Sequence, residues 1–124
     1  MDQSNTRLYS DTHKWIVFLS DNTARIGISD YAQRKLKSCI FVTLPDEGDE
    51  VECGVSFGEI ESVKVNSEII SPVSGRISAV NTDVLDEPGL INSAPYETWL
   101  VEVTDITDRQ ELMDEAAFKA YCGE

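Results

Sequence analysis

The sequence predicts a mainly β fold, a flattened barrel or sandwich of short antiparallel strands, with short helices that include one at the C-terminus. Three observations predict it. Apolar residues recur at period two or in short β-branched runs, and glycine, proline and asparagine separate these runs at short intervals. Helical spacing is confined to one short stretch in the first third and to the C-terminal end. A chain of 124 residues corresponds to a single domain, residues 1–124.

The first half of the chain predicts three strands, at residues 9–19, 23–28 and 40–44. The first has Trp15, Val17 and Leu19 at period two, and the last is a continuous β-branched and apolar run ended by a proline. Turns are expected at residues 21–22 and 47–49. Between the second and third strands, Ser29 is predicted to cap a short helix that runs to Leu36, because a serine hydroxyl accepts a hydrogen bond from a free amide of the first turn.

The second half predicts further short strands. The strands between residues 51 and 74 are expected to be separated at Gly54, near Lys64 and at Pro72. A turn at Gly75 is expected to lead into a strand at residues 76–80, and a last strand is expected at residues 99–103. Residues 81–98 predict a long loop with one helical turn. Thr107 to Gln110 resembles a capping box and predicts the start of the C-terminal helix. Its expected apolar side consists of Leu112, Met113, Ala116, Ala117, Ala120 and Tyr121.

The charge of the chain excludes several classes of partner. Ten lysines and arginines oppose 23 aspartates and glutamates, which gives a net charge of −13. Binding to nucleic acid or to an anionic membrane depends on positive charge, so neither is expected. No apolar run is long enough for a membrane span and the N-terminus lacks a signal core, so the chain is expected to be soluble. The acidic run of residues 46–52 has two interpretations that stay open: docking onto basic protein surfaces, or solubility alone.

Residues for metal binding or self-contained catalysis are sparse. Cys39, Cys53 and Cys122 form no C-x-x-C and stand beside a single histidine, His13, so no zinc pattern arises, and free thiols suit a reducing compartment. His13 has no evident nucleophile partner, and no phosphate-binding glycine loop is present. An enzyme with its own active site is the weakest interpretation.

One lysine has an unusual setting. Lys64 falls between two predicted strands, with Glu61 and Glu68 on either side, and a second turn follows at residues 71–75. Most exposed lysines serve solubility. A lysine raised on a hairpin within a framework of turns is also a candidate for attachment of a swinging prosthetic group.

Several short strings occur in a specific order and spacing. They are His13-Lys14-Trp15, Gly27-Ile28-Ser29-Asp30-Tyr31-Ala32-Gln33, Phe41-Val42-Thr43-Leu44-Pro45, Glu61-Ser62-Val63-Lys64, Ser71-Pro72-Val73-Ser74-Gly75, Leu90-Ile91-Asn92, Pro95-Tyr96 and Trp99-Leu100. In these strings, over residues 7–122, the chain resembles the H protein of the glycine cleavage system, its lipoyl-carrying subunit. Glu61-Ser62-Val63-Lys64 is identical to the lipoylation motif of that family.

The resemblance implies a carrier and not a catalyst. The fold would be the lipoyl-type flattened barrel of two small antiparallel sheets. Lipoate would be amide-linked to Lys64, and Glu61, Ser62, Val63 and Glu68 would contribute to recognition or contact the arm; no catalytic or metal-binding residue is implied. The arm would carry an aminomethyl group from glycine decarboxylase (P protein) to the aminomethyltransferase (T protein), and dihydrolipoyl dehydrogenase (L protein) would reoxidise it.

Further expectations follow from the same resemblance. A lipoate ligase or a lipoyl or octanoyl transferase would attach the cofactor. The compartment would be a bacterial cytoplasm or a mitochondrial-type matrix, and the carrier is expected to be a monomer. Which compartment applies stays open.

One departure from the family keeps an alternative open. Lys14 stands where the family commonly has glutamate, and a cationic side chain there would repel a cationic aminomethyl group. An H-like protein whose arm acts as a lipoyl donor or as a partner-specific redox relay is therefore a second hypothesis. A biotin carrier is a poor match, because Val63 and Val65 replace the usual methionines. An unmodified acidic interaction module is a third hypothesis, which Lys64→Ala would separate from both carriers.

Overall fold

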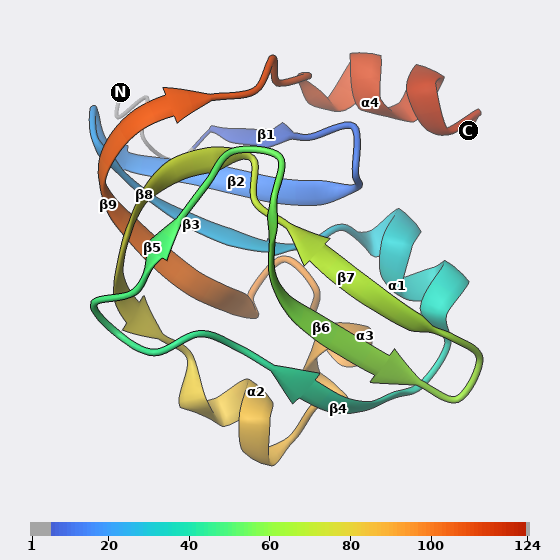
Figure 1. The fold of residues 1–124 in the computed structure, drawn as a ribbon. Coiled ribbons are helices and arrows are strands. Elements are labelled where there is room, and N and C mark those ends of the chain that lie inside the picture. The colour runs from blue at the N-terminus through green and yellow to red at the C-terminus, as the bar shows by residue number, and fades with distance from the viewer. Residues whose placement is uncertain (1–5, 124) are drawn as a thin grey trace.

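Two antiparallel sheets face each other in the computed structural model, which describes residues 6–123 (Figure 1). The larger sheet has the order β1-β2-β3-β9-β8-β5 and the smaller one β4-β6-β7. The strands are β1 (Arg7–Tyr9), β2 (Lys14–Ser20), β3 (Thr23–Ile28), β4 (Cys39–Thr43), β5 (Glu50–Val51), β6 (Ser56–Ser62), β7 (Asn66–Ile70), β8 (Val73–Val80) and β9 (Trp99–Arg109). The helices are α1 (Asp30–Leu36), α2 (Thr82–Asp86), α3 (Leu90–Ser93) and α4 (Glu115–Cys122). The predicted fold class is confirmed.

The core lies between the two sheets. Side chains alternate between the faces of a strand, so each sheet turns one apolar face inward. Ile16, Ile26 and Val101 lie in one register across β2, β3 and β9, and all three are fully buried. Ile60 and Ile69 from the smaller sheet are buried in the same cluster. None of the helices among residues 6–123 is long and apolar enough to cross a membrane.

Two local predictions in the first half are confirmed. Strand β3 covers the predicted residues 23–28. The Ser29 hydroxyl accepts a hydrogen bond from the Ala32 amide at 3.2 Å, and helix α1 runs to Leu36 as expected. The cap matters for the site described below, because it fixes where α1 begins against the end of β3.

The prediction of one strand over residues 9–19 is wrong. A turn separates β1 from β2: the Ser10 amide donates to the Lys14 carbonyl oxygen at 2.9 Å, and His13 adopts a left-handed backbone with a φ of 69°. Histidine adopts this conformation less readily than glycine, so the turn has no strong sequence signal.

Gly75 was expected to serve either a turn or close packing, and the structure shows close packing. It is not a turn residue but lies inside β8, where the register against β9 shifts. A Cβ at this position would lie 2.6 Å from the Thr104 carbonyl oxygen, so close backbone approach explains the glycine.

The C-terminal region departs from the sequence prediction in three ways. Strand β9 continues to Arg109, because Ser74 pairs with Asp108 and Val73 with Arg109. Residues 107–109 of the apparent capping box therefore lie in a strand and do not begin a helix. Helix α4 is instead capped by Asp114, whose carboxylate accepts from the Ala117 amide at 2.8 Å. The expected apolar side is wrong as well: α4 buries Phe118, while Ala116, Ala117, Ala120 and Tyr121 are exposed.

Residues 81–98 hold two short helices, α2 and α3, where one helical turn was predicted.

Candidate functional site

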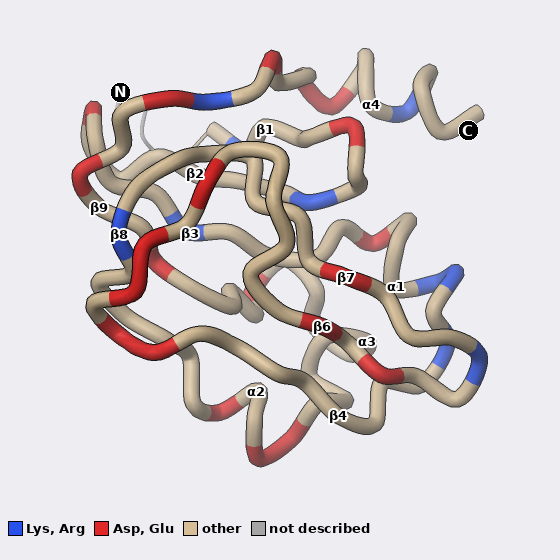
Figure 2. Tube along the Cα trace, viewed as in Figure 1, with Lys and Arg blue, Asp and Glu red and all other residues tan. Residues whose placement is uncertain are grey.

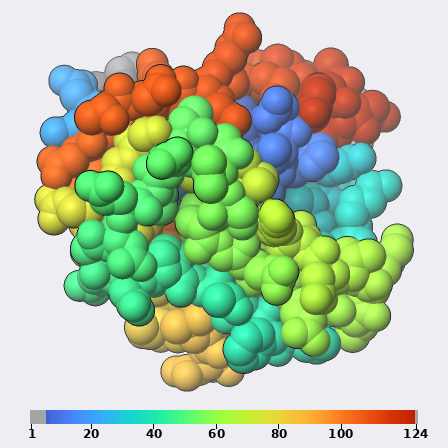
Figure 3. All heavy atoms as spheres, viewed as in Figure 1, coloured from blue at the N-terminus to red at the C-terminus, as the bar shows by residue number. Residues whose placement is uncertain are grey.

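Lys64 lies at the tip of the β6–β7 hairpin. The two strands pair antiparallel, with Glu61 opposite Asn66 as the last pair before the turn. The lysine is exposed, and within residues 6–123 its amine takes part in no hydrogen bond or ion pair. Figure 3 shows the atoms of this hairpin at the edge of the molecule, near those of α1. The structure therefore places Lys64 at a hairpin tip, as predicted.

The hydroxyl of Ser62 organises the turn that presents Lys64. It accepts hydrogen bonds from the Lys64 amide at 3.2 Å and the Val65 amide at 3.0 Å, and it donates to the Val65 carbonyl oxygen at 2.8 Å. These bonds use the one donor and both acceptor positions of a hydroxyl. The backbone around Lys64 is thereby fixed while its side chain stays accessible.

A second contact holds the tip from outside the hairpin. The Val63 amide donates to the Ser38 carbonyl oxygen at 3.0 Å, which ties the tip to the chain just after α1. The Val63 side chain itself is 64% exposed, and that of Val65 is 47% exposed. Lys64 is thus flanked by two apolar side chains that face solvent.

Carboxylates cover the outer face of the smaller sheet. Glu59 lies directly opposite Glu68 across β6 and β7, and Glu61 follows Glu59 on the same face. All three are exposed, and Figure 2 shows acidic positions along both strands of the hairpin. Like charges directly opposite each other disfavour a sheet. The hairpin therefore presents Lys64 beside a concentration of negative charge that packing does not require.

A cleft of about 250 Å³ opens beside the hairpin, on its other face. It lies between the turn before β2, the end of β3, helix α1 and strands β6 and β7. Its lining residues are Thr12, His13, Lys14, Ile28, Tyr31, Ala32, Lys35, Leu36, Ile60, Val65 and Ser67. Val65 follows Lys64 directly, so the mouth of the cleft adjoins the root of the lysine side chain.

Lys14 is buried in the wall of this cleft. Lys14 is only 5% exposed, and its ammonium donates a hydrogen bond to the Thr12 carbonyl oxygen at 2.6 Å. Burial lowers the pKa of Lys14 from 10.5 to about 8. Lys14, which the sequence analysis singled out, thus lies close to the hairpin. Its ammonium has no acidic partner among the described residues.

His13 lies next to Lys14 but in an aromatic environment. Its ring is 5.0 Å from that of Tyr31, and Phe118 and Tyr121 of α4 are also near. Burial lowers the pKa of His13 below 6.5; the Lys14 charge acts in the same direction and Asp11 opposes it. These contacts give His13 a packing role at the back of the cleft.

Sequence reasoning missed most of the cleft. Tyr31, Ala32 and Ile28 belong to a string that the sequence analysis identified, but no local pattern shows that α1 lies against the hairpin. Lys35, Ile60 and Ser67 had no signal at all. Trp15, from the string that includes Lys14, is buried, and its indole nitrogen donates to the Pro95 carbonyl oxygen at 2.9 Å.

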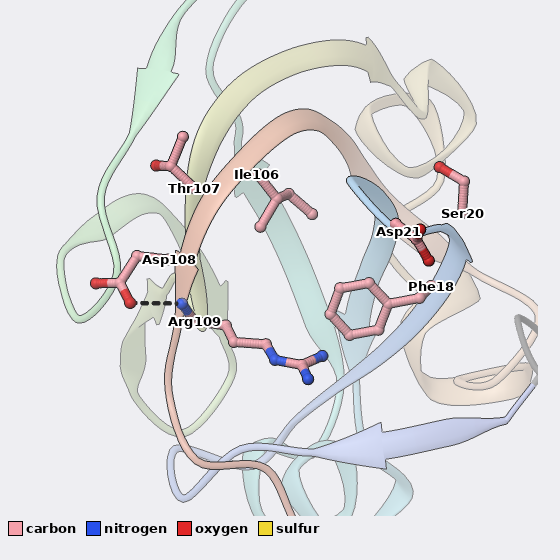
Figure 4. A pocket seen from close by; sticks show the side chains of 7 residues that line it. All are labelled: Phe18, Ser20, Asp21, Ile106, Thr107, Asp108 and Arg109. Atoms are coloured by element: carbon pink, nitrogen blue, oxygen red, sulfur yellow. Dashed lines mark hydrogen bonds between the residues drawn. The ribbon is translucent and has the colours of Figure 1, made fainter.

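A separate hollow lies where the β2–β3 turn meets the end of β9. Figure 4 shows its lining residues, with the Arg109 side chain extending toward the ring of Phe18; the guanidinium carbon is 5.0 Å from the ring centroid. Asp108 accepts from the Arg109 amide at 2.9 Å. This hollow lies away from the hairpin tip (Figure 1), and its lining contains neither a lysine nor a cysteine. We therefore take Lys64 and the adjoining cleft as the candidate functional site.

Comparison with known proteins agrees with this geometry. The family model described as glycine cleavage H-protein matches residues 7–124. The glycine cleavage system H protein of Lachnoclostridium phytofermentans is 42% identical over 92% of this chain and 90% of its own length. The mitochondrial glycine cleavage system H protein 2 of Arabidopsis thaliana is 44% identical over 94% of this chain and 76% of its own length.

A solved structure supports the same assignment. The crystal structure of a glycine cleavage system H protein from Mycobacterium marinum superposes with a TM-score of 0.90 and 35% sequence identity, and covers 100% of both chains. The chain belongs to the glycine cleavage H-protein family.

Proposed function

We propose that this protein is the lipoyl-carrying shuttle of a glycine cleavage system, with lipoate amide-linked to Lys64. The observation that carries the proposal is an exposed amine on a turn fixed by Ser62, inside the string Glu61-Ser62-Val63-Lys64; among residues 6–123 this amine has no hydrogen-bond or ion-pair partner. Attachment by an amide needs a reachable amine, and a fixed backbone lets an attaching enzyme recognise one lysine among several. Bound lipoate supplies a dithiolane that accepts and releases a one-carbon fragment and two electrons.

The residues present are suited to that group. The arm would start between the apolar side chains of Val63 and Val65 and would be longer than any standard side chain. The adjoining cleft has an apolar floor of buried Ile28, Leu36 and Ile60, which matches a hydrocarbon arm and its dithiolane. Ser62 would act through the turn, because its hydroxyl is already committed to backbone groups.

The roles of the acidic residues follow from their position. Glu61 and Glu68 lie on the face of the hairpin opposite the cleft, so they would contact an approaching enzyme and not a folded-back arm. A lipoate ligase or a lipoyl or octanoyl transferase would recognise them together with Val63. The carrier would have no catalytic residue of its own.

The partners would act in sequence on one arm. Glycine decarboxylase would leave an aminomethyl group on a lipoyl sulfur. The aminomethyltransferase would pass its carbon to tetrahydrofolate and release ammonia, and dihydrolipoyl dehydrogenase would reoxidise the resulting dithiol with NAD. A tethered group meets each active site at high effective concentration, which is the benefit of a small carrier. We propose that it works as a monomer in a reducing compartment; the relatives above include a bacterial and a mitochondrial protein.

A second function has one observation in its favour. Lys14 places positive charge in the cleft, which does not suit storage of a cationic aminomethyl arm. A lipoyl donor or redox relay outside glycine cleavage would need no such storage.

Reconstitution separates these functions. Lipoylated protein is combined with P, T and L proteins, and glycine-dependent formation of NADH is followed. The shuttle predicts turnover that is lost in Lys64→Ala and kept in the matched surface variant Lys119→Ala, on α4. Full lipoylation without glycine-dependent turnover would reject the shuttle in favour of the relay, and activity that survives Lys64→Ala would reject both.

A further inference from the structure

The cleft beside Lys64 differs in charge from the rest of the molecule. The chain has a net charge of −13, yet the described residues that line the cleft include Lys14 and Lys35 and no carboxylate. Lys35 projects from α1, with its ammonium 5.3 Å from the Tyr31 ring centroid, and lies at the exposed rim. Lys14 lies in the buried wall. An acidic protein therefore contains a locally positive pocket next to its candidate attachment site.

The surrounding acids do not neutralise this pocket. On α1, Asp30 pairs with Arg34 at 3.0 Å. On the hairpin, Ile60 and Ser67 line the cleft, so Glu59, Glu61 and Glu68 lie on the opposite face. Asp11, on the turn before β2, acts on His13. The ammonium of Lys14 therefore remains a buried charge whose one hydrogen-bond partner in the described structure is the neutral Thr12 carbonyl.

We propose that this cleft binds the end of the Lys64 arm as a thiolate, held by Lys14, and rejects the arm when its end is cationic. The inference rests on lipoylation of Lys64. In the reduced arm both sulfurs are thiols; one loses its proton to solvent and its thiolate pairs with the ammonium, with no electron transferred in that step. Lys14 has already lost most of its hydration on folding, so an arriving anion gains attraction without that cost, and an arriving ammonium meets repulsion.

The consequence is a selective resting state. The aminomethyl-loaded arm stays outside the cleft and is open to the next enzyme. The dithiol left after the one-carbon unit has been passed on is retained in those molecules in which one sulfur is ionised. Lys14 acts as a positioning residue, since the bonds that change during transfer are on the arm.

The test measures the acidity of the arm thiols directly. Protein lipoylated on Lys64 is reduced with a phosphine and alkylated briefly with iodoacetamide across a pH series. The mass of the peptide that carries Lys64 then reports arm alkylation apart from the three cysteines. A lipoylated synthetic peptide of residues 61–68, treated in the same way, gives the thiol pKa without the cleft.

We expect the apparent pKa of the arm thiol to be lower on the folded protein than on the peptide by about one unit or more, because a nearby positive charge stabilises the thiolate. Lys14→Met and Lys14→Gln remove the cation at similar side-chain length and should restore the thiol pKa of the peptide. Lys35→Met, at the rim, should change the thiol pKa less than the Lys14 variants do. Equal values for the folded protein and the peptide would overturn the inference, even if both Lys14 variants failed to fold. Absence of the lipoyl group on Lys64 would overturn the proposed function as well, so the two failures are distinguishable.

Discussion

At the scale of single residues, Lys14 is the feature that most distinguishes this site. A buried lysine with one neutral hydrogen-bond partner destabilises the folded state, because the unfolded chain keeps its ammonium in water. Such residues are retained at functional sites more readily than elsewhere. The sequence alone identified the position as unusual, but not that the side chain would be buried in a cleft wall.

The lowered pKa of Lys14 predicts how stability depends on pH. Below about 8 the folded protein holds a charged, buried ammonium; between about 8 and 10.5 the unfolded chain binds more protons than the folded one, so stability rises with pH through that window. We expect Lys14→Met to remove this rise and to increase the free energy of unfolding at pH 7 by about 1–3 kcal/mol. Urea unfolding at a series of pH values measures both effects, and an unchanged pH profile in the variant would contradict the assignment.

Ser62 provides a second residue-scale prediction. Its hydroxyl satisfies three backbone groups of the turn, so Ser62→Ala should cost about 1–3 kcal/mol and speed amide exchange at Lys64 and Val65. Ser67→Ala on the next strand is the matched control, because none of the side-chain hydrogen bonds described for residues 6–123 involves Ser67. Hydrogen exchange that is equally slow in both variants would show that the turn does not depend on Ser62.

At the scale of elements, local signals predicted the strands better than the turns between them. The run at residues 23–28 and the cap at Ser29 need only local chemistry, and both were correct. The extension of β9 through Arg109 depends on its pairing with β8, which overrides a local capping signal. The cleft depends on α1 packing beside the hairpin, and this contact between distant segments has no local signature.

Gly58 tests the packing of the hairpin against its neighbour. A Cβ there would collide with the Thr43 carbonyl oxygen of β4, whereas a Cβ at Gly89 would have nothing within 4 Å. Gly58→Ala should therefore lower the free energy of unfolding by about 1–3 kcal/mol, and Gly89→Ala should leave it within about 1 kcal/mol. Thermal melting of both variants compares them, and equal melting temperatures would show that β4 and β6 adjust freely.

At the scale of the whole molecule, the acidic surface lies beside Lys64, the proposed attachment lysine. The net charge of −13 has two interpretations from sequence, docking or solubility, and the structure adds that Glu59, Glu61 and Glu68 share one face beside Lys64. That placement favours docking onto a basic surface around a partner's active site. The sequence predicted the excess of acid but not the face on which it gathers.

Docking by charge predicts a strong salt dependence. Raising the ionic strength from about 0.01 M to 0.15 M shortens the screening length from about 30 to 8 Å. We expect the association rate with glycine decarboxylase to fall roughly tenfold or more over this range, with a weaker dependence in Glu59→Gln/Glu61→Gln/Glu68→Gln. Stopped-flow binding measures it. A rate that does not respond to salt would leave solubility as the explanation of the acidity.

Peptide mass after incubation of the protein with lipoate, ATP and a lipoate ligase shows whether Lys64 carries lipoate. We expect one lipoyl increment, located on Lys64, absent in Lys64→Ala and retained in Lys119→Ala. A folded protein that gains no increment, or gains it on another lysine, would rule out Lys64 as the lipoyl carrier.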